Sequence, residues 1–118
     1  MPWYAASVIM YVKFKDGIQN KYPIWENVIL IRARSQKAAL SLAKKRAKRD
    51  EGDSDGSFTW EKRPATWVFA GIRKLVTCSC ENRLGHGTEV TFSQMEVKDY
   101  RAFVNLVKGR PVKILYEE

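Results

Sequence analysis

The stretch Ile24-Trp25-Glu26-Asn27-Val28-Ile29-Leu30-Ile31-Arg32-Ala33-Arg34-Ser35 decides the fold, because it reads as a strand that runs directly into a helix. Its first ten residues are rich in β-branched and other apolar side chains, which favour a strand over residues 24–33. Residues 28–31 are apolar on both faces of that strand, which predicts a central position in a sheet. Ser35 is a good helix N-cap, since its hydroxyl can accept a free backbone N–H of the following turn.

A helix of about four turns is predicted over residues 36–49, immediately after this strand. When the residues are projected at about 100° each, one side of the helix is apolar and consists of Ala39, Leu40, Leu42, Ala43 and Ala47. The opposite side consists of Lys37, Ser41, Lys44, Lys45 and Lys48. We therefore expect the alanines to pack closely on a sheet and the lysines to face solvent.

Outside this region, apolar alternation predicts further strands at 3–14, 66–80, 88–97 and 112–116 and a second helix at 100–108. Asp99 suits the N-cap of the second helix and Gly109 the position after its end. Gly71 indicates a bulge or bend, and Arg63-Pro64 should break a short extended piece at 58–60. The order strand, strand, helix, strand, strand, helix, strand predicts an α+β fold with a mostly antiparallel sheet and both helices on one face.

Length and composition restrict the class of protein. The chain has 118 residues, of which 45% are hydrophobic and 12% aromatic, as expected for one globular domain over residues 1–118. No apolar run approaches the ~18 residues of a membrane span, and the N-terminus lacks the pattern of a secretory signal. Strand geometry holds Cys78 and Cys80 far enough apart to strain a disulfide between them, which predicts reduced thiols in a cytoplasmic protein. Because there is no apolar span, no membrane partner is expected.

Positive charge is concentrated in one part of the chain. The net charge is +8, from 21 basic and 13 acidic side chains. Eight of the basic residues lie between positions 32 and 49, where there is no acid: Arg32, Arg34, Lys37, Lys44, Lys45, Arg46, Lys48 and Arg49. The rest of the chain therefore has equal numbers of basic and acidic residues, and the whole excess belongs to the first helix and its approach.

This charge leads to the main functional hypothesis, a non-enzymatic binding module. Lys44 and Lys48 lie four residues apart on the helix and repel each other, which an anionic partner would relieve. The expected anion-binding residues are Lys37, Lys44, Lys45, Lys48 and Arg49, with nucleic acid as the first partner and an acidic protein as the second. Aromatic rings of Trp3, Tyr4 or Trp60 would offer stacking surfaces. The competing interpretation is a solvated helix face, neutralised by the acidic loop at 50–56.

Two segments partly resemble metal sites, one for calcium and one for zinc, and neither matches the full ligand pattern. Glu51, Asp53, Asp55 and Gly56 resemble a calcium loop, but Lys62 stands where that loop needs its twelfth-position glutamate. Cys78, Cys80 and His86 lack a fourth zinc ligand, and the two cysteines are closer in sequence than zinc ligands usually are. The sequence thus predicts no metal and no cofactor.

Catalysis finds little support, and no catalytic residue is assigned. Glu26 and Glu89 could form a carboxylate pair as in a metal-dependent hydrolase, which is a remote alternative. Ion pairs of these residues with Arg32 or Arg73 are the preferred interpretation. Cys80 and His86 lack a third group to orient them. The stronger alternative to anion binding is a structural or protein-interaction domain, a homodimer joined through a sheet edge or an aromatic patch.

Several segments together resemble a known family. They are Trp3-Tyr4-Ala5-Ala6, residues 26–35 with the alanines that follow, Trp67-Val68-Phe69-Ala70-Gly71-Ile72-Arg73-Lys74-Leu75 and Gly87-Thr88-Glu89-Val90. Their order and spacing resemble the small bacterial family catalogued as domain of unknown function 4288, over residues 3–97. The resemblance implies a shared fold and a bacterial or phage origin, and it brings no catalytic residues. Residues 98–118 would be an extension beyond the core of the family.

Overall fold

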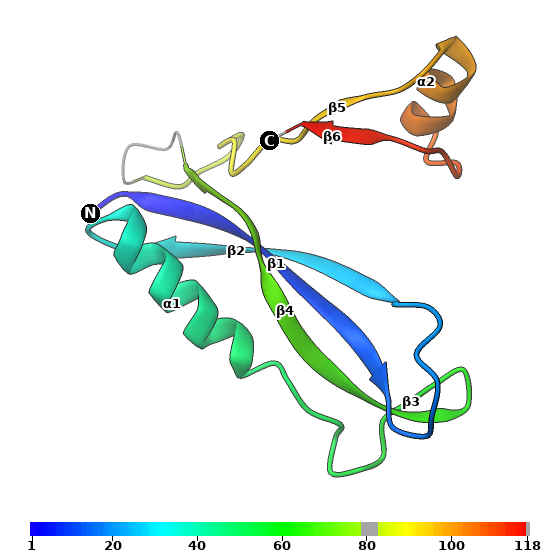
Figure 1. Ribbon diagram of the computed structural model, residues 1–118. Helices are drawn as coiled ribbons and strands as arrows, with labels where there is room; N and C mark the ends of the chain where they lie inside the picture. Colours follow the sequence, from blue (N-terminus) through cyan, green and yellow to red (C-terminus); the bar gives the residue numbers. More distant parts are fainter. Residues whose placement is uncertain (79–82, 118) are drawn as a thin grey trace.

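The chain forms an α+β fold, as predicted. The structure is a computed structural model that describes residues 1–78 and 83–117. A four-stranded antiparallel sheet has the order β2-β1-β4-β3, and a separate two-stranded ribbon joins β5 to β6 (Figure 1). The elements are β1 (Trp3–Phe14), β2 (Ile24–Arg32), α1 (Gln36–Lys48), β3 (Thr59–Trp60), β4 (Arg63–Thr77), β5 (Gln94–Glu96), α2 (Tyr100–Val107) and β6 (Leu115–Glu117).

β1 is the central strand, and it begins and ends where the alternation predicts. Its side chains at Tyr4, Val8 and Met10 contact the α1 side of the sheet, where they pack with Ala39 and Ala47. Because successive side chains of a strand point to opposite faces, the odd-numbered residues of β1 lie on the face away from α1. Two of the three core clusters therefore lie between the sheet and α1, and the third, around Val12, Phe14 and Ala65, packs against Phe58, Trp60 and Trp67.

α1 lies on the sheet through its alanines, as expected. The Ser35 hydroxyl oxygen accepts a hydrogen bond from the Ala38 N–H at 3.1 Å, which confirms the predicted N-cap. Ala39, Ala43 and Ala47 are fully buried, and their small size lets the helix approach the strands closely. Leu42 differs from the prediction, since 44% of it is exposed. It lines the groove between α1 and the edge strand β2, where it stays accessible to solvent.

β2 is an edge strand, so the prediction of a central position is wrong. Two hydrogen bonds at the ends of the β1–β2 pair fix which residues of β2 bond to β1: the Val12 N–H donates to the Pro23 carbonyl, and the Ala33 N–H donates to the Pro2 carbonyl. Antiparallel pairing alternates, so the odd-numbered residues of β2 bond to β1 and the even-numbered ones direct their N–H and C=O groups outward. α1 explains the apolar character of only one face of β2. On the other face, Val28 is 46% exposed.

β4 differs from the prediction at its start and agrees with it in the middle. Arg63-Pro64 does not break the chain, because β3 and β4 form a hairpin whose turn residues Glu61 and Lys62 have φ of 52° and 64°. Positive φ at both positions is typical of the tight turns that join antiparallel strands. Two register shifts against β1 lie on either side of Gly71, which confirms the predicted bulge.

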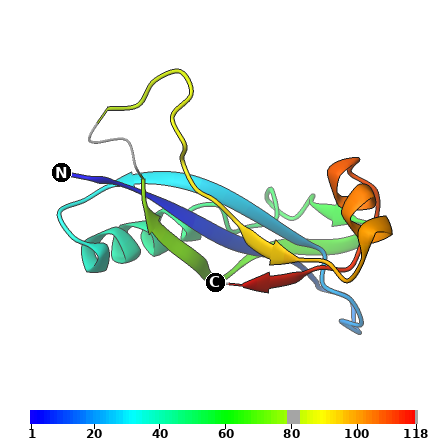
Figure 2. The same ribbon diagram turned by 90° about the horizontal axis from the view of Figure 1, so that it is seen from above.

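The last part of the chain leaves the sheet as an arm, which we define as residues 93–117. Asp99 caps α2 by accepting the Ala102 N–H, and Gly109 has the positive φ expected after a helix. The predicted strand at 88–97 is reduced to β5, which pairs with β6, and α2 sits on this ribbon apart from the sheet (Figure 2). The expected packing of both helices on one face thus holds for α1 only. The predicted loop at 82–87 falls partly outside the described residues.

Two cation–aromatic contacts to β4 hold the arm and the residue just before it, Phe92. The Arg73 guanidinium lies 4.7 Å from the centre of the Tyr116 ring, and the Lys74 ammonium lies 4.7 Å from the Phe92 ring. Such contacts are worth about 0.5–1 kcal/mol each when exposed. Neither helix in the described ranges has the length and apolarity that would let it cross a membrane.

Candidate anion-binding surface

All five predicted anion-binding side chains are exposed on α1 or at its C-cap. They are Lys37, Lys44, Lys45, Lys48 and Arg49. Within residues 1–78 and 83–117, the only ion pair made by a cation of α1 joins Arg46 to Asp50 at 3.2 Å. The five predicted side chains therefore keep their charge without a carboxylate of the described chain within ion-pair distance.

The acidic loop after α1 is bound elsewhere. Asp53 pairs with Lys15, at the end of β1, and also accepts the Gly56 N–H at 3.0 Å. The hydrogen bond from Lys15, and next that from Gly56, lower the pKa of Asp53 from its ordinary value of 3.8. Glu51 accepts the Phe69 N–H of β4 at 2.8 Å. The loop thus braces the sheet, and Asp50 is its only carboxylate that pairs with α1.

These contacts also bear on calcium. A calcium loop needs several carboxylates directed at one point, whereas Glu51 and Asp53 are committed to different partners. Among the residues that the structure describes, no three His, Cys, Asp or Glu side chains are grouped as a metal would require.

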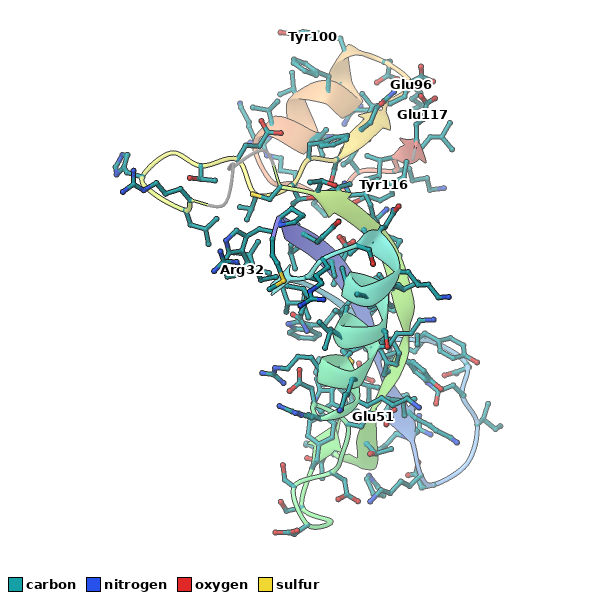
Figure 3. All side chains as sticks on the ribbon, turned by 90° about the vertical axis from the view of Figure 1, so that its left-hand side faces the viewer. Arg32, Glu51, Glu96, Tyr100, Tyr116 and Glu117 are labelled. Atoms are coloured by element: carbon teal, nitrogen blue, oxygen red, sulfur yellow. The ribbon has the colours of Figure 1, made fainter. Side chains whose placement is uncertain are left out.

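Two shallow grooves run along α1, one on each side, and cations line both. The groove toward β2 has a volume of about 380 Å³, with an apolar floor from Ile29, Ile31 and Leu42 and cations from Arg32, Lys45, Arg46 and Arg49. The groove toward β4 has a volume of about 420 Å³ and includes Lys37, Leu40 and Lys74. Figure 3 is turned so that α1 faces the reader, with Arg32 near the start of the helix and Glu51 beyond its end. The cationic surface is therefore wider than the helix itself.

An aromatic cluster lies beyond the C-terminal end of α1. The Trp25 ring lies 5.7 Å from the Trp60 ring and 5.4 Å from the Trp67 ring, and 48% of Trp25 is exposed. Trp25 and Asp50 line a small pocket of about 190 Å³ on the same face of the sheet as α1. Asp50 directly follows the helix, where its N–H donates to Ala47. A flat apolar ring is thus available next to the basic surface.

Trp25 was not among the three aromatic residues predicted to offer stacking surfaces, and one of those three, Tyr4, is not accessible for stacking. Tyr4 is buried in the core against Ala33 and Ala39. Trp3 is partly buried, with the Arg32 guanidinium 5.7 Å from its ring centre. One signal for Trp25 was its position in β2. Alternation along the strand places Trp25 on the face of the sheet that α1 covers, but Trp25 lies beyond the end of the helix and so stays exposed.

Of the residues considered for catalysis, Glu26 has a clear structural partner. It pairs with Arg73 at 2.6 Å, which confirms the preferred ion-pair interpretation for Glu26. The main-chain oxygen of Glu89 accepts a hydrogen bond from the thiol of Cys78 at 3.4 Å, and Cys78 is buried. His86 is exposed. Cys80 falls outside the described residues, so the proposed Cys80–His86 pair and the three-residue zinc hypothesis are untested.

Comparisons with known proteins identify the family but no relative of known activity. A search of curated proteins gave no match, and a search of solved structures gave none either. Residues 3–92, about three quarters of the chain, match the family described as Domain of unknown function (DUF4288), so the chain belongs to that family.

Proposed function

We propose that the chain is a non-enzymatic binding module that presents the outward side of α1 to nucleic acid. The observation that carries this proposal is the set of five exposed cations with no ion pair in the described chain: Lys37, Lys44, Lys45, Lys48 and Arg49. An acidic protein is the second kind of partner with the same charge. As part of the same proposal, the module acts in a bacterial cytoplasm.

Electrostatics gives the reason for a polyanion. Cations four residues apart on α1, such as Lys44 and Lys48, repel each other by a few tenths of a kcal/mol. Phosphates along a nucleic-acid backbone would neutralise them and release bound counterions, which is the main source of sequence-independent affinity. The helix is about 20 Å long and so spans several consecutive phosphates. The cations that line the two flanking grooves extend this surface sideways.

Trp25 favours single-stranded nucleic acid as the ligand. Bases of a single strand can stack on an exposed aromatic ring, whereas bases in a duplex are already stacked on each other. A strand that follows α1 toward its C-terminal end would bring a base to the half-exposed Trp25 ring. The proposed site thus combines phosphate contacts on the helix with one stacking position beyond it.

The first test measures binding against salt. We expect a labelled single-stranded oligonucleotide to bind at ~50 mM salt, with a log–log slope of about −0.7 per phosphate contact. The double variant Lys44→Gln/Lys48→Gln should make this slope less steep by about 1.4. The control Lys108→Gln/Lys113→Gln removes the same charge from the arm and should leave the slope unchanged.

Trp25→Ala separates stacking from charge. Loss of one stacked base should weaken single-strand binding by about 1–3 kcal/mol and leave the salt slope unaltered. Polyglutamate, used as a competitor, distinguishes the acidic-protein version: binding to polyglutamate without binding to oligonucleotides would transfer the site to that class. The proposal is wrong if neither polymer binds at ~50 mM salt, or if the arm control loses as much affinity as the α1 variant.

A further inference from the structure

Two exposed apolar surfaces remain unexplained, and the first is on the sheet. Val8 and Met10 of β1 face α1, so their neighbours Ser7 and Tyr11 face away from it. Val28 of β2 pairs with Ser7 and Ile24 with Tyr11, which places both on the side of the sheet opposite α1. Tyr22 joins them, since its ring lies 5.6 Å from that of Tyr11. We call the exposed group Tyr22, Ile24 and Val28 the free-face patch.

The second surface is on α2. Tyr100, Phe103 and Val107 are 78%, 51% and 69% exposed, and they are spaced so that they share one side of the helix. On its other sides α2 carries Ala102, which is buried, and Val104 and Leu106, which are partly buried. Arg101 and Asn105 give α2 one polar side, so its apolar surface is wider than the single stripe with which a surface helix usually faces its core. We call the exposed side the α2 stripe.

The single chain does not bring the two surfaces together. Tyr116 and Phe92 fix the start of the arm to β4. From there the ribbon carries α2 to its far end, away from the sheet and on the side opposite α1 (Figures 1 and 2). Within the described ranges, β5 and β6 pair only with each other. Each chain therefore exposes an apolar side of α2 and, on either side of the Glu26–Arg73 ion pair, apolar residues of the sheet face opposite α1.

The chain exposes much more surface than a compact protein of its mass, which is enough for a large interface with another protein. The chain exposes 8687 Å², whereas a compact protein of 13.6 kDa exposes about 6,600 Å². Its radius of gyration is 17.1 Å, against about 13.5 Å for a compact chain of this length. The excess of about 2,100 Å² per chain would supply a tightly associated homodimer, whose interface buries about 2,000–5,000 Å² in total.

We propose that the protein is a two-fold homodimer in which the α2 stripe of each copy packs on the free-face patch of the other. A second copy is the occupant that the area favours, because one chain supplies both halves of the contact and a two-fold axis makes each half meet the other. The exchange also explains β2, whose sequence is that of a strand covered on both faces although it lies at an edge. The second cover comes from the α2 of the partner.

The dimer is compatible with the proposed function and independent of it. α1 and its cations lie on one side of the sheet, and the free-face patch lies on the other. Association would therefore leave the basic surface of both copies open. Raising the salt concentration distinguishes dimerisation from nucleic-acid binding, since salt strongly weakens phosphate contacts but does not weaken apolar association.

Light scattering coupled to gel filtration provides the test. At ~100 μM and ~300 mM salt we expect twice the mass of one chain, 13.6 kDa. Val28→Asp and Phe103→Asp, one on each surface, should each give the single-chain mass with an unchanged far-UV circular dichroism spectrum. Leu42→Asp is the matched control, because Leu42 is as exposed as Val28 (44% and 46%) but lies on the α1 side. It should remain dimeric.

Milder substitutions keep the test decisive if an aspartate variant fails to fold. Val28→Thr and Phe103→Ser should each raise the dimer dissociation constant at least ~10-fold, and Leu42→Thr should leave it within ~2-fold. The melting temperature of the wild type should rise with protein concentration, as it does for any dimer that is lost on unfolding. A wild type of single-chain mass at ~100 μM, or a dimer that resists substitution on both surfaces, overturns the proposal.

Discussion

Asp53 illustrates how a single acidic residue can stabilise this fold from an exposed loop. It pairs with Lys15 and accepts the Gly56 N–H, and both contacts favour the charged carboxylate. The pKa of Asp53 is lowered in the folded chain, mainly by Lys15. A carboxylate with a lowered pKa stabilises the fold fully above its unfolded pKa, and this stabilisation is lost as the pH falls through the folded pKa.

Asp53→Asn should therefore flatten the acid side of the stability profile. The wild type is expected to lose stability as the pH falls from about 4, the ordinary pKa of an unfolded aspartate, through the lower pKa of the folded Asp53. The variant has no such proton to bind, so the difference in urea midpoint between the two proteins should shrink between pH 6 and pH 2. Asp55→Asn, in the same loop, should follow the wild type. An equal difference at both pH values would contradict this assignment.

At the residue scale, the sequence predicted the charges of the candidate site better than its rings. The outward side of α1 follows from helical periodicity alone, so the exposure of Lys44 and Lys48 could be predicted. The role of Trp25 depends on where the helix ends over the sheet, which is a tertiary property. Tyr4 was misjudged because β1 is buried on the α1 side along its whole length.

At the element scale, α1 depends on the cap that starts it. The Ser35 hydroxyl satisfies the Ala38 N–H, which would otherwise be left without an intrahelical partner. We expect Ser35→Ala to lower the free energy of unfolding by about 1 kcal/mol in urea denaturation. Ser41→Ala makes the same chemical change in the middle of the exposed side, where alanine is the better helix former, and should be neutral or slightly stabilising. Equal losses in both variants would mean that the cap contributes nothing.

Elements whose signals are local were predicted well, and those that depend on distant partners were not. β1 and α1 were predicted almost to the residue, from alternation and a cap. β2 was predicted in the centre of the sheet because residues 28–31 are apolar on both faces. That pattern does not show whether a second strand lies beside β2, and none does in the described sheet. The strand at 88–97 was expected in the same sheet as the others, whereas β5 pairs with β6 in a separate ribbon. Pairing is decided by the whole fold, and no local pattern records it.

At the scale of the whole molecule, the core and the arm are separate. All three core clusters are built from residues between Tyr4 and Leu75. The family match ends at residue 92, before β5 begins. The sheet with α1 therefore has its own hydrophobic core, and the arm adds surface to it.

Residues 1–92 alone should therefore fold. We expect the shortened chain to unfold cooperatively in urea, because every core cluster is retained. It should also be monomeric, since the α2 stripe is absent, and should bind single-stranded oligonucleotide with the salt slope of the full chain, since α1 is intact. Circular dichroism, light scattering and anisotropy measure the three properties. A chain that unfolds without a cooperative transition would show that the arm belongs to the core.

The two bulges of β4 determine the direction in which the chain continues after that strand. Around Gly71, β4 uses two more residues than β1 over the same paired length, and bulges bend and coil a strand. The end of β4 consequently curves away from α1 (Figure 1), so the chain departs toward the opposite side of the sheet. Loss of one of these residues would interchange inward and outward positions from that point on, and the appended helix would be delivered to a different side of the protein.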